Sequence, residues 1–400
     1  MIIGIDLRAI GQGKYSGVEE YALNLLNALF SIDHKNKYLL FSSGQSISNR
    51  YLDFSQKAKK NNSNIDLCRS SIPNRILNAS FKVFSWPKID KLMNGADIVF
   101  EPNINLLPSF KAKKVVTFHD LSFEKYSNFF SPKQIFWHNF VNPKKIAREA
   151  DFIIAVSEST KNDLREIYGI PKEKIKVIYS GVSSCAPLSP KASEGHSKTT
   201  EDKGSKIKEI KIKYNLPEKY ILYLGTIEPR KNIIGLIRAF ELFKKSHSPS
   251  ALSHKLLIAG SKGWLCEDIF YAAGHSAWKD DIIFTGFIAD EDKAYLYNLA
   301  SLFVYPSFYE GFGFPPLEAM ASDVPVITSD CSSLPEVVGV SAIMVNPYNS
   351  GQLARAMEEV LGNEKLREKM ILKGREQAKK FSWNKCARET LEIFESVNKG

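Results

Sequence analysis

An alternation of short apolar runs with longer amphipathic stretches constrains the fold of this chain more than any other feature. In the first half, mostly apolar runs of three to five residues occur at 2–5, 38–41, 98–100, 115–118, 152–156 and 175–179. Stretches with helical spacing lie between them at 18–30 and at 131–150, and Pro143 is expected to kink or break the second one. Short runs rich in β-branched residues, separated by helices, predict buried parallel strands with helical crossovers.

The alternation stops near residue 181 and starts again at residue 220. Residues 183–207 are rich in Ser, Lys, Thr, Gly, Glu and Pro, which predicts a linker or a mobile excursion. The later part predicts strands at 220–224, 255–259, 281–284, 302–305 and 325–328, and helices at 232–243, 291–300, 315–321, 350–361, 364–380 and 384–398. The 400 residues therefore predict two α/β domains, 1–182 and 208–383, each with an open parallel sheet. Such sheets bind ligands at the carboxyl ends of their strands, so we expect a ligand in a cleft between the domains.

The positive charge of the chain is concentrated in its first half. The formal charge is +10; residues 1–200 contain 28 Lys and Arg against 18 Asp and Glu, whereas residues 201–400 contain 26 of each. An excess of positive charge favours an anionic partner such as nucleic acid, an acidic substrate or a membrane surface. Compositional drift in a lysine-rich organism would give the same sum, so the charge alone does not choose among these.

The cysteines and the apolar runs indicate the compartment. The chain has five widely spaced cysteines and no Cys-x-x-Cys pair, which favours free thiols in a reducing compartment over disulfides or a zinc site. The first residues lack the basic and apolar regions of a signal peptide, and no apolar run approaches the ~20 residues of a membrane span. We therefore expect a cytoplasmic protein, with peripheral contact to the inner face of the cell membrane left open.

A glycine-rich loop after the strand at 302–305 predicts an anion site. The loop contains Gly311 and Gly313, which let backbone N–H groups approach a ligand, and it leads into a helix at 315–321. Prolines at the start of this helix suit its first turn, and the helix N-terminus supplies free donors and partial positive charge.

Two carboxylates flank this loop. Glu310 precedes it and Glu318 lies at the start of the helix. Carboxylates accept hydrogen bonds from sugar hydroxyls, so an anion site between two of them predicts a nucleotide sugar, with its diphosphate on the helix N-terminus. On its own, Glu318 is also explained as a charge that complements the helix dipole.

A second loop, after the strand at 220–224, carries two cations. It reads Gly-Thr-Ile-Glu-Pro-Arg-Lys-Asn and places Arg230 and Lys231 at the start of a helix, where the helix dipole does not favour positive charge. This conflict indicates a function, and the pair could neutralise a leaving diphosphate. A solvated helix start is the alternative.

Three positions in the first domain are further candidates. The loop with glycines at 11, 13 and 17 is not a dinucleotide fingerprint, and Gly17 fits better in a loop over the diphosphate. His119 and Asp120 end a buried strand, from which His119 could bind a sugar hydroxyl, although a histidine there is more often structural. At the next strand end, Ser157 is a weaker acceptor-binding candidate, and Ser159 or Thr160 is expected to cap the following helix.

Together these segments resemble family 4 of the retaining glycosyltransferases, which have the GT-B fold. Glu310 and Glu318, with seven residues between them, match the E-x7-E motif of that family, and residues 225–232 are similar to its donor-phosphate motif. Residues 119–123 and 155–161 resemble the N-terminal domain of its mannosyltransferase-like branch. The likeness covers nearly the whole chain, and its motifs occur in the family's order.

The resemblance implies roles for the two domains. Residues 1–182 would bind the acceptor, residues 208–383 would bind a nucleotide diphosphate sugar, and the last helix, about 384–400, would cross back onto the first domain. The residues expected to be catalytic are His119, Glu310, Arg230 and Lys231. Those expected to bind the donor are Gly17, Gly225, Thr226, Arg230, Lys231, Gly286, Phe287, Glu310, Gly311, Phe312, Gly313, Phe314 and Glu318. Thr226 stands where the family usually has an arginine, which Arg230 is expected to replace.

The expected reaction moves a hexose from a nucleotide diphosphate sugar, with GDP-mannose favoured, to a saccharide or lipid-linked glycan in surface polysaccharide synthesis, such as lipopolysaccharide or capsule. We expect retention of the donor's anomeric configuration. No metal is expected, because the sequence lacks an Asp-x-Asp between apolar strands and Arg230 and Lys231 would take over its electrostatic role.

Two other classes of function stay open on the sequence. A related nucleotide-sugar enzyme is possible, although an epimerase would need an acid–base set that we do not find and a sugar-phosphate synthase would need a basic acceptor pocket. A non-enzymatic basic protein that binds membrane or nucleic acid is the other class. Residues 75–93 intersperse Lys and Arg with Phe, Trp and Leu, which fits either an interfacial patch on an anionic bilayer or a helix packed on the sheet. Nucleic acid is not expected as a partner.

Overall fold

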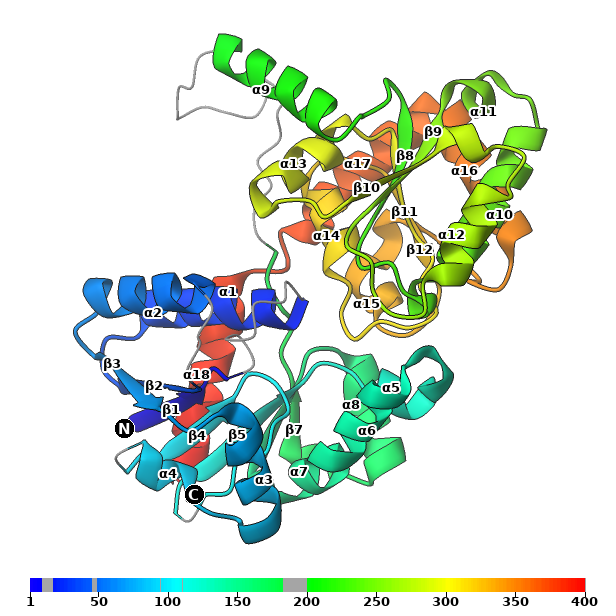
Figure 1. The fold of residues 1–400 in the computed structure, drawn as a ribbon. Helices are drawn as coiled ribbons and strands as arrows, with labels where there is room; N and C mark the ends of the chain where they lie inside the picture. Colours follow the sequence, from blue (N-terminus) through cyan, green and yellow to red (C-terminus); the bar gives the residue numbers. More distant parts are fainter. Residues whose placement is uncertain (9–16, 45–48, 94, 110, 183–199, 400) are drawn as a thin grey trace. The chain divides into compact units, whose positions relative to one another are not determined.

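The computed structural model describes residues 1–8, 17–44, 49–93, 95–109, 111–182 and 200–399. The chain divides into two compact units (Figure 1). Unit 1 contains Met1–Phe123, Pro132–Gly181 and Phe381–Gly400, and unit 2 contains Glu124–Ser131 and Val182–Lys380. Residues 183–199 of the expected linker lie outside the described residues, whereas its last part, 200–207, begins helix α9 (Thr200–Lys213).

Unit 1 is built on a parallel sheet of seven strands in the order β3-β2-β1-β4-β5-β6-β7. The strands are β1 (Ile2–Asp6), β2 (Lys37–Ser43), β3 (Ile65–Ser70), β4 (Ile98–Glu101), β5 (Lys113–Phe118), β6 (Phe152–Ala155) and β7 (Ile175–Val177). Its helices are α1 (Gly17–Ile32), α2 (Asn49–Asn61), α3 (Asn74–Phe84), α4 (Ile89–Leu92), α6 (Pro132–Val141), α7 (Pro143–Glu149), α8 (Glu158–Tyr168) and α18 (Trp383–Lys399). The short helix α5 (Ser122–Lys125) begins in unit 1 and ends in unit 2.

Unit 2 is built on a parallel sheet of six strands in the order β10-β9-β8-β11-β12-β13. The strands are β8 (Tyr220–Leu224), β9 (Lys255–Ala259), β10 (Ile282–Gly286), β11 (Leu302–Tyr305), β12 (Val326–Ser329) and β13 (Ile343–Val345). With α9, its helices are α10 (Ile233–Lys245), α11 (Pro249–Ser253), α12 (Glu267–Gly274), α13 (Asp290–Leu299), α14 (Phe314–Ala321), α15 (Leu334–Val338), α16 (Ser350–Gly362) and α17 (Glu364–Ala378).

The predicted fold class of two α/β units with parallel sheets is confirmed. The central strands are buried along their whole length, as in β8 and β11, because helices cover both faces of each sheet. In both sheets the strand order reverses beside the first strand, between β1 and β4 in unit 1 and between β8 and β11 in unit 2. The carboxyl ends of strands at such a reversal form a crevice in which open α/β sheets bind ligands.

The C-terminal helix α18 packs within unit 1, although 199 residues of unit 2 precede Phe381. Figure 1 shows this red helix beside the blue and cyan strands. The ring of Phe394 lies 5.2 Å from that of Phe100 on β4, and the ring of Trp383 lies 5.9 Å from that of Tyr21 on α1. Lys176 on β7 is paired with Glu392 at 3.1 Å. Aromatic packing and an ion pair thus tie the end of the chain to the first sheet.

The break expected at Pro143 is present. Helix α6 ends at Val141 and α7 begins at Pro143, and Asn142 between them adopts φ 57° and accepts a hydrogen bond from the backbone N of Lys145. The sequence did not predict β3, α2, α12 or β13. Strand β3 is an edge strand that is buried only at its first residue, so it lacks the apolar run of a central strand.

Candidate active site

The loop between β11 and α14 has the predicted shape, and one glycine in it is required. Gly313 is the N-cap of α14 and has φ 106°, which glycine adopts far more easily than other residues. A Cβ at this position would lie 2.8 Å from Cδ2 of Leu334. Pro315 and Pro316 occupy the first turn of α14, where proline costs no hydrogen bond. The loop therefore ends at a helix start whose first backbone N–H groups are those of Gly313 and Phe314.

Two serines that the sequence analysis missed hold the loop in place. The Ser332 hydroxyl accepts a hydrogen bond from the backbone N of Glu310 at 2.9 Å. The Ser333 hydroxyl lies 3.0 Å from the carbonyl oxygen of Glu310 and 2.8 Å from that of Phe312. Both serines follow strand β12, which lies beside β11 in the sheet. In the sequence, only this position after a predicted strand could have indicated them.

The second predicted loop runs from β8 to α10 and lies beside the first. Arg230 and Lys231 form a short 3-10 turn (Pro229–Lys231), and Asn232, at φ 56°, separates this turn from α10. The Asn232 amide donates hydrogen bonds to the carbonyl oxygens of Pro306, at 3.0 Å, and Pro347, at 2.7 Å. One buried side chain thus fastens the loop after β8 to the loop after β11.

The structure brings Lys231, Arg230 and Glu310 into one cluster. Lys231 Nζ donates to Glu310 Oε1 at 2.6 Å and to the Tyr305 hydroxyl at 2.8 Å. Arg230 Nη1 lies 3.1 Å from Glu310 Oε2 and 2.7 Å from the carbonyl oxygen of Tyr309. Each oxygen of the Glu310 carboxylate therefore has a cationic donor, and such charge-assisted hydrogen bonds are the strong ones.

A fourth charge, Glu228, completes this cluster. Its Oε1 accepts from Arg230 Nη2 at 2.6 Å, and its side chain is buried. The cluster therefore contains two cations and two carboxylates, which explains how positive charges are tolerated at this end of α10. Glu228 was not among the predicted site residues, although it lies only two positions before Arg230.

Burial and the neighbouring cations have opposite effects on the pKa of the Glu310 carboxyl. Burial acts to raise the pKa of the Glu310 carboxyl, but the charges of Lys231 and Arg230 outweigh it and lower that pKa to about 2. Burial, together with the charge of Arg230, lowers the pKa of the Lys231 ammonium. Glu310 is therefore a carboxylate at neutral pH, an acceptor that cannot donate a proton.

Glu318 lies apart from this cluster. It is buried in α14, and its Oε2 accepts a hydrogen bond of 2.8 Å from the hydroxyl of Tyr297 on α13. The two members of the E-x7-E motif thus have different partners, one cationic and one a phenol. This difference is consistent with different roles for the two carboxylates.

The remaining predicted donor residues lie at the ends of β8 and β10. Gly225 follows β8, and the carbonyl oxygen of Thr226 accepts from the Tyr223 hydroxyl at 3.1 Å. A Cβ on Gly260 would lie 2.0 Å from the carbonyl oxygen of Gly225, so the backbone is tightly packed here. Gly286 ends β10 with φ 73°, and Phe287 after it is 48% exposed. Phe287 therefore presents an aromatic ring to solvent.

In unit 1, His119 and Asp120 follow β5 as predicted. His119 Nε2 lies 2.8 Å from the carbonyl oxygen of Pro102, so this nitrogen carries the hydrogen and Nδ1 is the acceptor. Burial lowers the pKa of the His119 imidazole, which is therefore neutral at pH 7. Asp120 Oδ1 accepts from the backbone N and the hydroxyl of Ser122 at 2.9 and 2.6 Å. Both side chains thus have a structural partner.

The expectation that Ser159 or Thr160 caps the following helix is wrong. The N-cap of α8 is Ser157, which is fully buried and whose hydroxyl accepts from the backbone N of Thr160 at 3.0 Å. Strand β6 ends at Ala155, one residue earlier than expected, and the backbone is already helical at Glu158. Gly17 is the first residue of α1, and the glycines at 11 and 13 lie outside the described residues.

No three or more His, Cys, Asp or Glu side chains of the described part gather as they would around a metal ion. Within the same residues, no helix combines the length and apolar character that a membrane span needs.

Comparison with known proteins gives consistent matches over both units. Residues 206–377 match the profile of the glycosyl transferases group 1, and residues 15–184 match that of glycosyltransferase family 4. The O-antigen chain mannosyltransferase B of Escherichia coli is 32% identical over 305 residues, which are 76% of this chain and 75% of that protein. The serotype-specific mannosyltransferase WbdA of Escherichia coli is 34% identical over 258 residues, 64% of this chain and 30% of that protein.

A solved structure supports the same fold. The Anabaena protein HepE, in complex with UDP and glucose, superimposes with a TM-score of 0.70 at 18% identity, over 99% of this chain and 100% of that one. At this identity the likeness concerns the fold.

Proposed function

The chain belongs to glycosyltransferase family 4 and has the GT-B fold, and we propose that it is a retaining mannosyltransferase that uses GDP-mannose. One observation carries the proposal: Lys231, Arg230 and Glu310 meet at the carboxyl ends of β8 and β11, where the strand order of unit 2 reverses. The choice of mannose is supported by the two Escherichia coli relatives, both of which are named mannosyltransferases.

In the proposed donor complex, the diphosphate lies between the start of α14 and the two cations. The start of α14 offers partial positive charge and the backbone N–H groups of Gly313 and Phe314, because Pro315 and Pro316 have none, and Arg230 and Lys231 add two formal charges. Backbone groups of Gly311, Phe312, Gly313 and Phe314 contact sugar and phosphate. Glu318 binds the ribose, and Gly225, Thr226, Gly286 and Phe287 surround the rest of the nucleotide.

The cations are neutralised by carboxylates in the structure, which has a consequence for donor binding. Glu310 occupies the donors of Lys231 and Arg230 that a diphosphate would need. We propose that the diphosphate shares or displaces these contacts, which turns the Glu310 carboxylate toward the hydroxyls of the hexose. Glu228 keeps its contact with Arg230 and holds the guanidinium in place. Glu310 then contributes both to orienting the cations and to binding the sugar.

The chemistry that fits these residues is front-face transfer. As the bond between the anomeric carbon and the leaving phosphate oxygen breaks, that oxygen takes the proton of the acceptor hydroxyl, and the new glycosidic bond forms on the same face. Lys231 and Arg230 stabilise the negative charge that develops on the diphosphate. This charge stabilisation is the electrostatic part of what a divalent cation does in other transferases, so we propose that no metal is required.

The proposed acceptor is a saccharide or lipid-linked glycan that extends a surface polysaccharide such as lipopolysaccharide or capsule. His119 and Asp120 in unit 1 are the proposed acceptor contacts, with Nδ1 of His119 available as a hydrogen-bond acceptor. Ser157 supports that region by capping α8. We propose that the enzyme acts in the cytoplasm, peripherally on the inner face of the membrane.

A panel of donors tests the choice of nucleotide and sugar. Thermal unfolding is measured with GDP-mannose, UDP-glucose, UDP-galactose, GDP and UDP at equal concentrations. We expect GDP-mannose and GDP to raise the unfolding temperature most, since a ligand that binds the folded state at about 100 times its Kd adds about 2.7 kcal/mol of stability. Larger stabilisation by a uridine sugar would contradict GDP-mannose as the donor. Stabilisation by none of them would contradict the donor site itself.

A further inference from the structure

The helix α3 has two apolar sides, and one of them faces the core. Leu77 and Phe81 are buried on that side, in the cluster that includes Val99 of β4. Arg8, at the end of β1, fixes the helix: its Nη1 donates to Asn78 Oδ1 at 2.9 Å, and its guanidinium lies 5.3 Å from the centre of the Phe81 ring. Arg8 is itself buried and paired with Asp6 at 2.8 Å. The inner side of α3 is therefore rigidly attached to the sheet.

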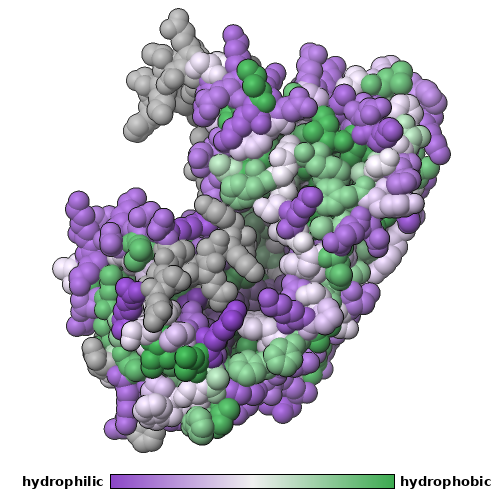
Figure 2. Space-filling view, viewed as in Figure 1, coloured by the Kyte–Doolittle hydropathy of each residue, from purple (hydrophilic) through white to green (hydrophobic). Residues whose placement is uncertain are grey.

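The other side of α3 exposes large apolar side chains. Ile76 and Val83, seven positions apart and so on one side of the helix, are 60% and 69% exposed. Phe84, the last helical residue, is 74% exposed, and Trp86 just after it is 66% exposed. We call Ile76, Val83, Phe84 and Trp86 the α3 patch. Figure 2 shows apolar side chains, in green, among hydrophilic ones on the surface of the unit that contains α3.

Positive charge surrounds the α3 patch. Residues 71–93 contain the basic residues Arg75, Lys82, Lys88 and Lys91, against a single acidic one, Asp90. Arg75, Lys82 and Lys91 are exposed. Asp90 is buried, and its Oδ2 accepts from the backbone N of Lys111 at 2.8 Å. Its negative charge is therefore directed into the unit, and the surface around the patch is positive.

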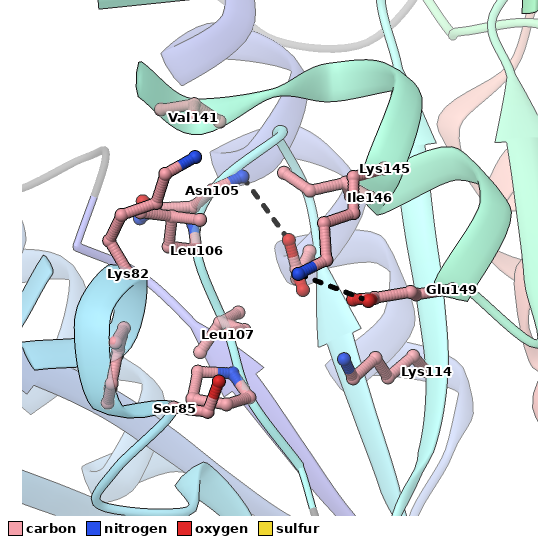
Figure 3. A pocket seen from close by; sticks show the side chains of 13 residues that line it. Lys82, Ser85, Asn105, Leu106, Leu107, Lys114, Val141, Lys145, Ile146 and Glu149 are labelled. Carbon is pink, nitrogen blue, oxygen red and sulfur yellow. Dashed lines mark hydrogen bonds and ion pairs between the residues drawn. The ribbon is translucent and has the colours of Figure 1, made fainter. Parts of the chain in front are cut away.

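A pocket at the C-terminal end of α3 adds to this charge (Figure 3). Lys82 and Ser85, which line it, lie next to Val83, Phe84 and Trp86 in the sequence, so pocket and patch share one turn. Lys114 of β5 and Lys145 of α7 also line the pocket, with Lys145 paired to Glu149 at 3.6 Å. Glu101 also lines the pocket, and burial, together with the neighbouring Asp6, raises the pKa of its carboxyl.

From this arrangement we propose that the α3 patch docks unit 1 onto an anionic bilayer. Apolar and aromatic side chains with a basic border are the pattern of interfacial segments: the apolar groups enter the boundary of the acyl region and lysines contact anionic headgroups. Lipid phosphates are the anions that the mouth of the pocket, at Lys82, would meet. The proposal commits to a lipid surface because the exposed charged side chains of residues 71–93 are all positive. It does not depend on which sugar is transferred.

Co-sedimentation with vesicles tests this docking. Vesicles of about one-third phosphatidylglycerol in phosphatidylcholine are compared with pure phosphatidylcholine, at low and high salt and without nucleotide. We expect binding to the anionic vesicles at low salt that falls as salt screens the charges. The pair Lys82→Gln and Lys88→Gln should bind about thirtyfold more weakly, and the pair Phe84→Ser and Trp86→Ser about a hundredfold.

Matched substitutions on unit 2 control for general effects. Lys369→Gln with Lys373→Gln, both exposed on α17, controls for charge, and Leu372→Ser with Tyr271→Ser, at 60% and 65% exposure, controls for apolar area. These should bind vesicles as the original protein does. All variants should unfold and bind GDP normally, because the substituted side chains are exposed, apart from Lys88, which is half-buried.

Three results would overturn the docking proposal: no binding of the original protein to anionic vesicles at low salt, equal losses in patch and control variants, or binding unchanged by the patch substitutions. A dimer in sedimentation velocity that only the patch substitutions dissociate would also overturn it, because the patch would then cover a second copy. Since these measurements use no donor, they can fail while the proposed sugar transfer stands.

Discussion

Replacing Glu310 by glutamine is expected to lower the rate of sugar transfer by about a hundredfold or more. The carboxylate accepts from Lys231 at 2.6 Å and from Arg230 at 3.1 Å, and it is the proposed contact for the hexose. Losing one strong transition-state contact in a water-poor site costs about 10²–10³ in turnover. The measurement is the initial rate of GDP release from GDP-mannose at saturating donor.

The same variant should bind GDP as well as, or better than, the original protein. Without the Glu310 charge, Lys231 and Arg230 are no longer neutralised by it and attract the diphosphate more strongly. A loss in turnover without a loss in nucleotide affinity would show that Glu310 acts in the transfer of the sugar and not only in the binding of the nucleotide. Turnover near that of the original protein would remove Glu310 from the catalytic site.

Loss of stability is the main alternative explanation and has a matched control. Breaking a buried ion pair costs about 3–5 kcal/mol, so Glu310→Gln is expected to lower the unfolding temperature. Asp292 of unit 2 is also a buried carboxylate, paired with Lys213 at 2.6 Å and with the Tyr214 hydroxyl at 2.9 Å. Asp292→Asn should therefore lower stability in the same way while leaving turnover at saturating donor nearly unchanged.

Replacing Lys231 by alanine should lower both nucleotide affinity and turnover. Its ammonium is the buried cation proposed to contact the diphosphate, and a hydrogen bond to a charged group contributes about 1.5–3 kcal/mol. This corresponds to roughly tenfold to a hundredfold weaker binding of GDP, and well over tenfold slower transfer. Isothermal titration with GDP and the initial-rate assay measure the two effects.

Lys244 provides the matched control for this substitution. It lies on α10, it is buried, and it is paired with Asp281 at 2.8 Å and bonded to the carbonyl oxygen of Ala251 at 2.9 Å. Lys244→Ala should destabilise unit 2 without affecting GDP binding. If Lys231→Ala binds GDP as Lys244→Ala does, the diphosphate is held elsewhere.

The parts of the site that could be predicted are those whose residues lie close together in the sequence. The run that ends at Tyr305, the glycines after it and the two carboxylates lie within one stretch of sequence, and the structure has the expected strand, loop and helix there. The basic pair was predicted for the same reason. Local spacing reveals such features because strand, turn and helix signals are themselves local.

The contacts that join distant segments could not be predicted. Nothing in the sequence shows that Lys231 meets Glu310, 79 positions later, or that Asn232 bonds the carbonyl oxygen of Pro347. The network in which Arg8 joins Asp6, Asn78 and the carbonyl oxygen of Leu106 was missed for the same reason. These pairs depend on which strands are neighbours, and strand order is set by the packing of the whole unit.

The most direct test of the account is GDP release from GDP-mannose by the purified protein in the presence of EDTA. The acceptor is a saccharide taken from the surface polysaccharide that the enzyme is proposed to extend. We predict release that depends on the acceptor, persists in EDTA, exceeds that from UDP-glucose or UDP-galactose, and falls by well over tenfold in Lys231→Ala. Mannose in the product should keep the anomeric configuration of the donor. Release that Lys231→Ala leaves unchanged, or that occurs from a uridine sugar alone, would contradict the proposed mannosyltransferase site.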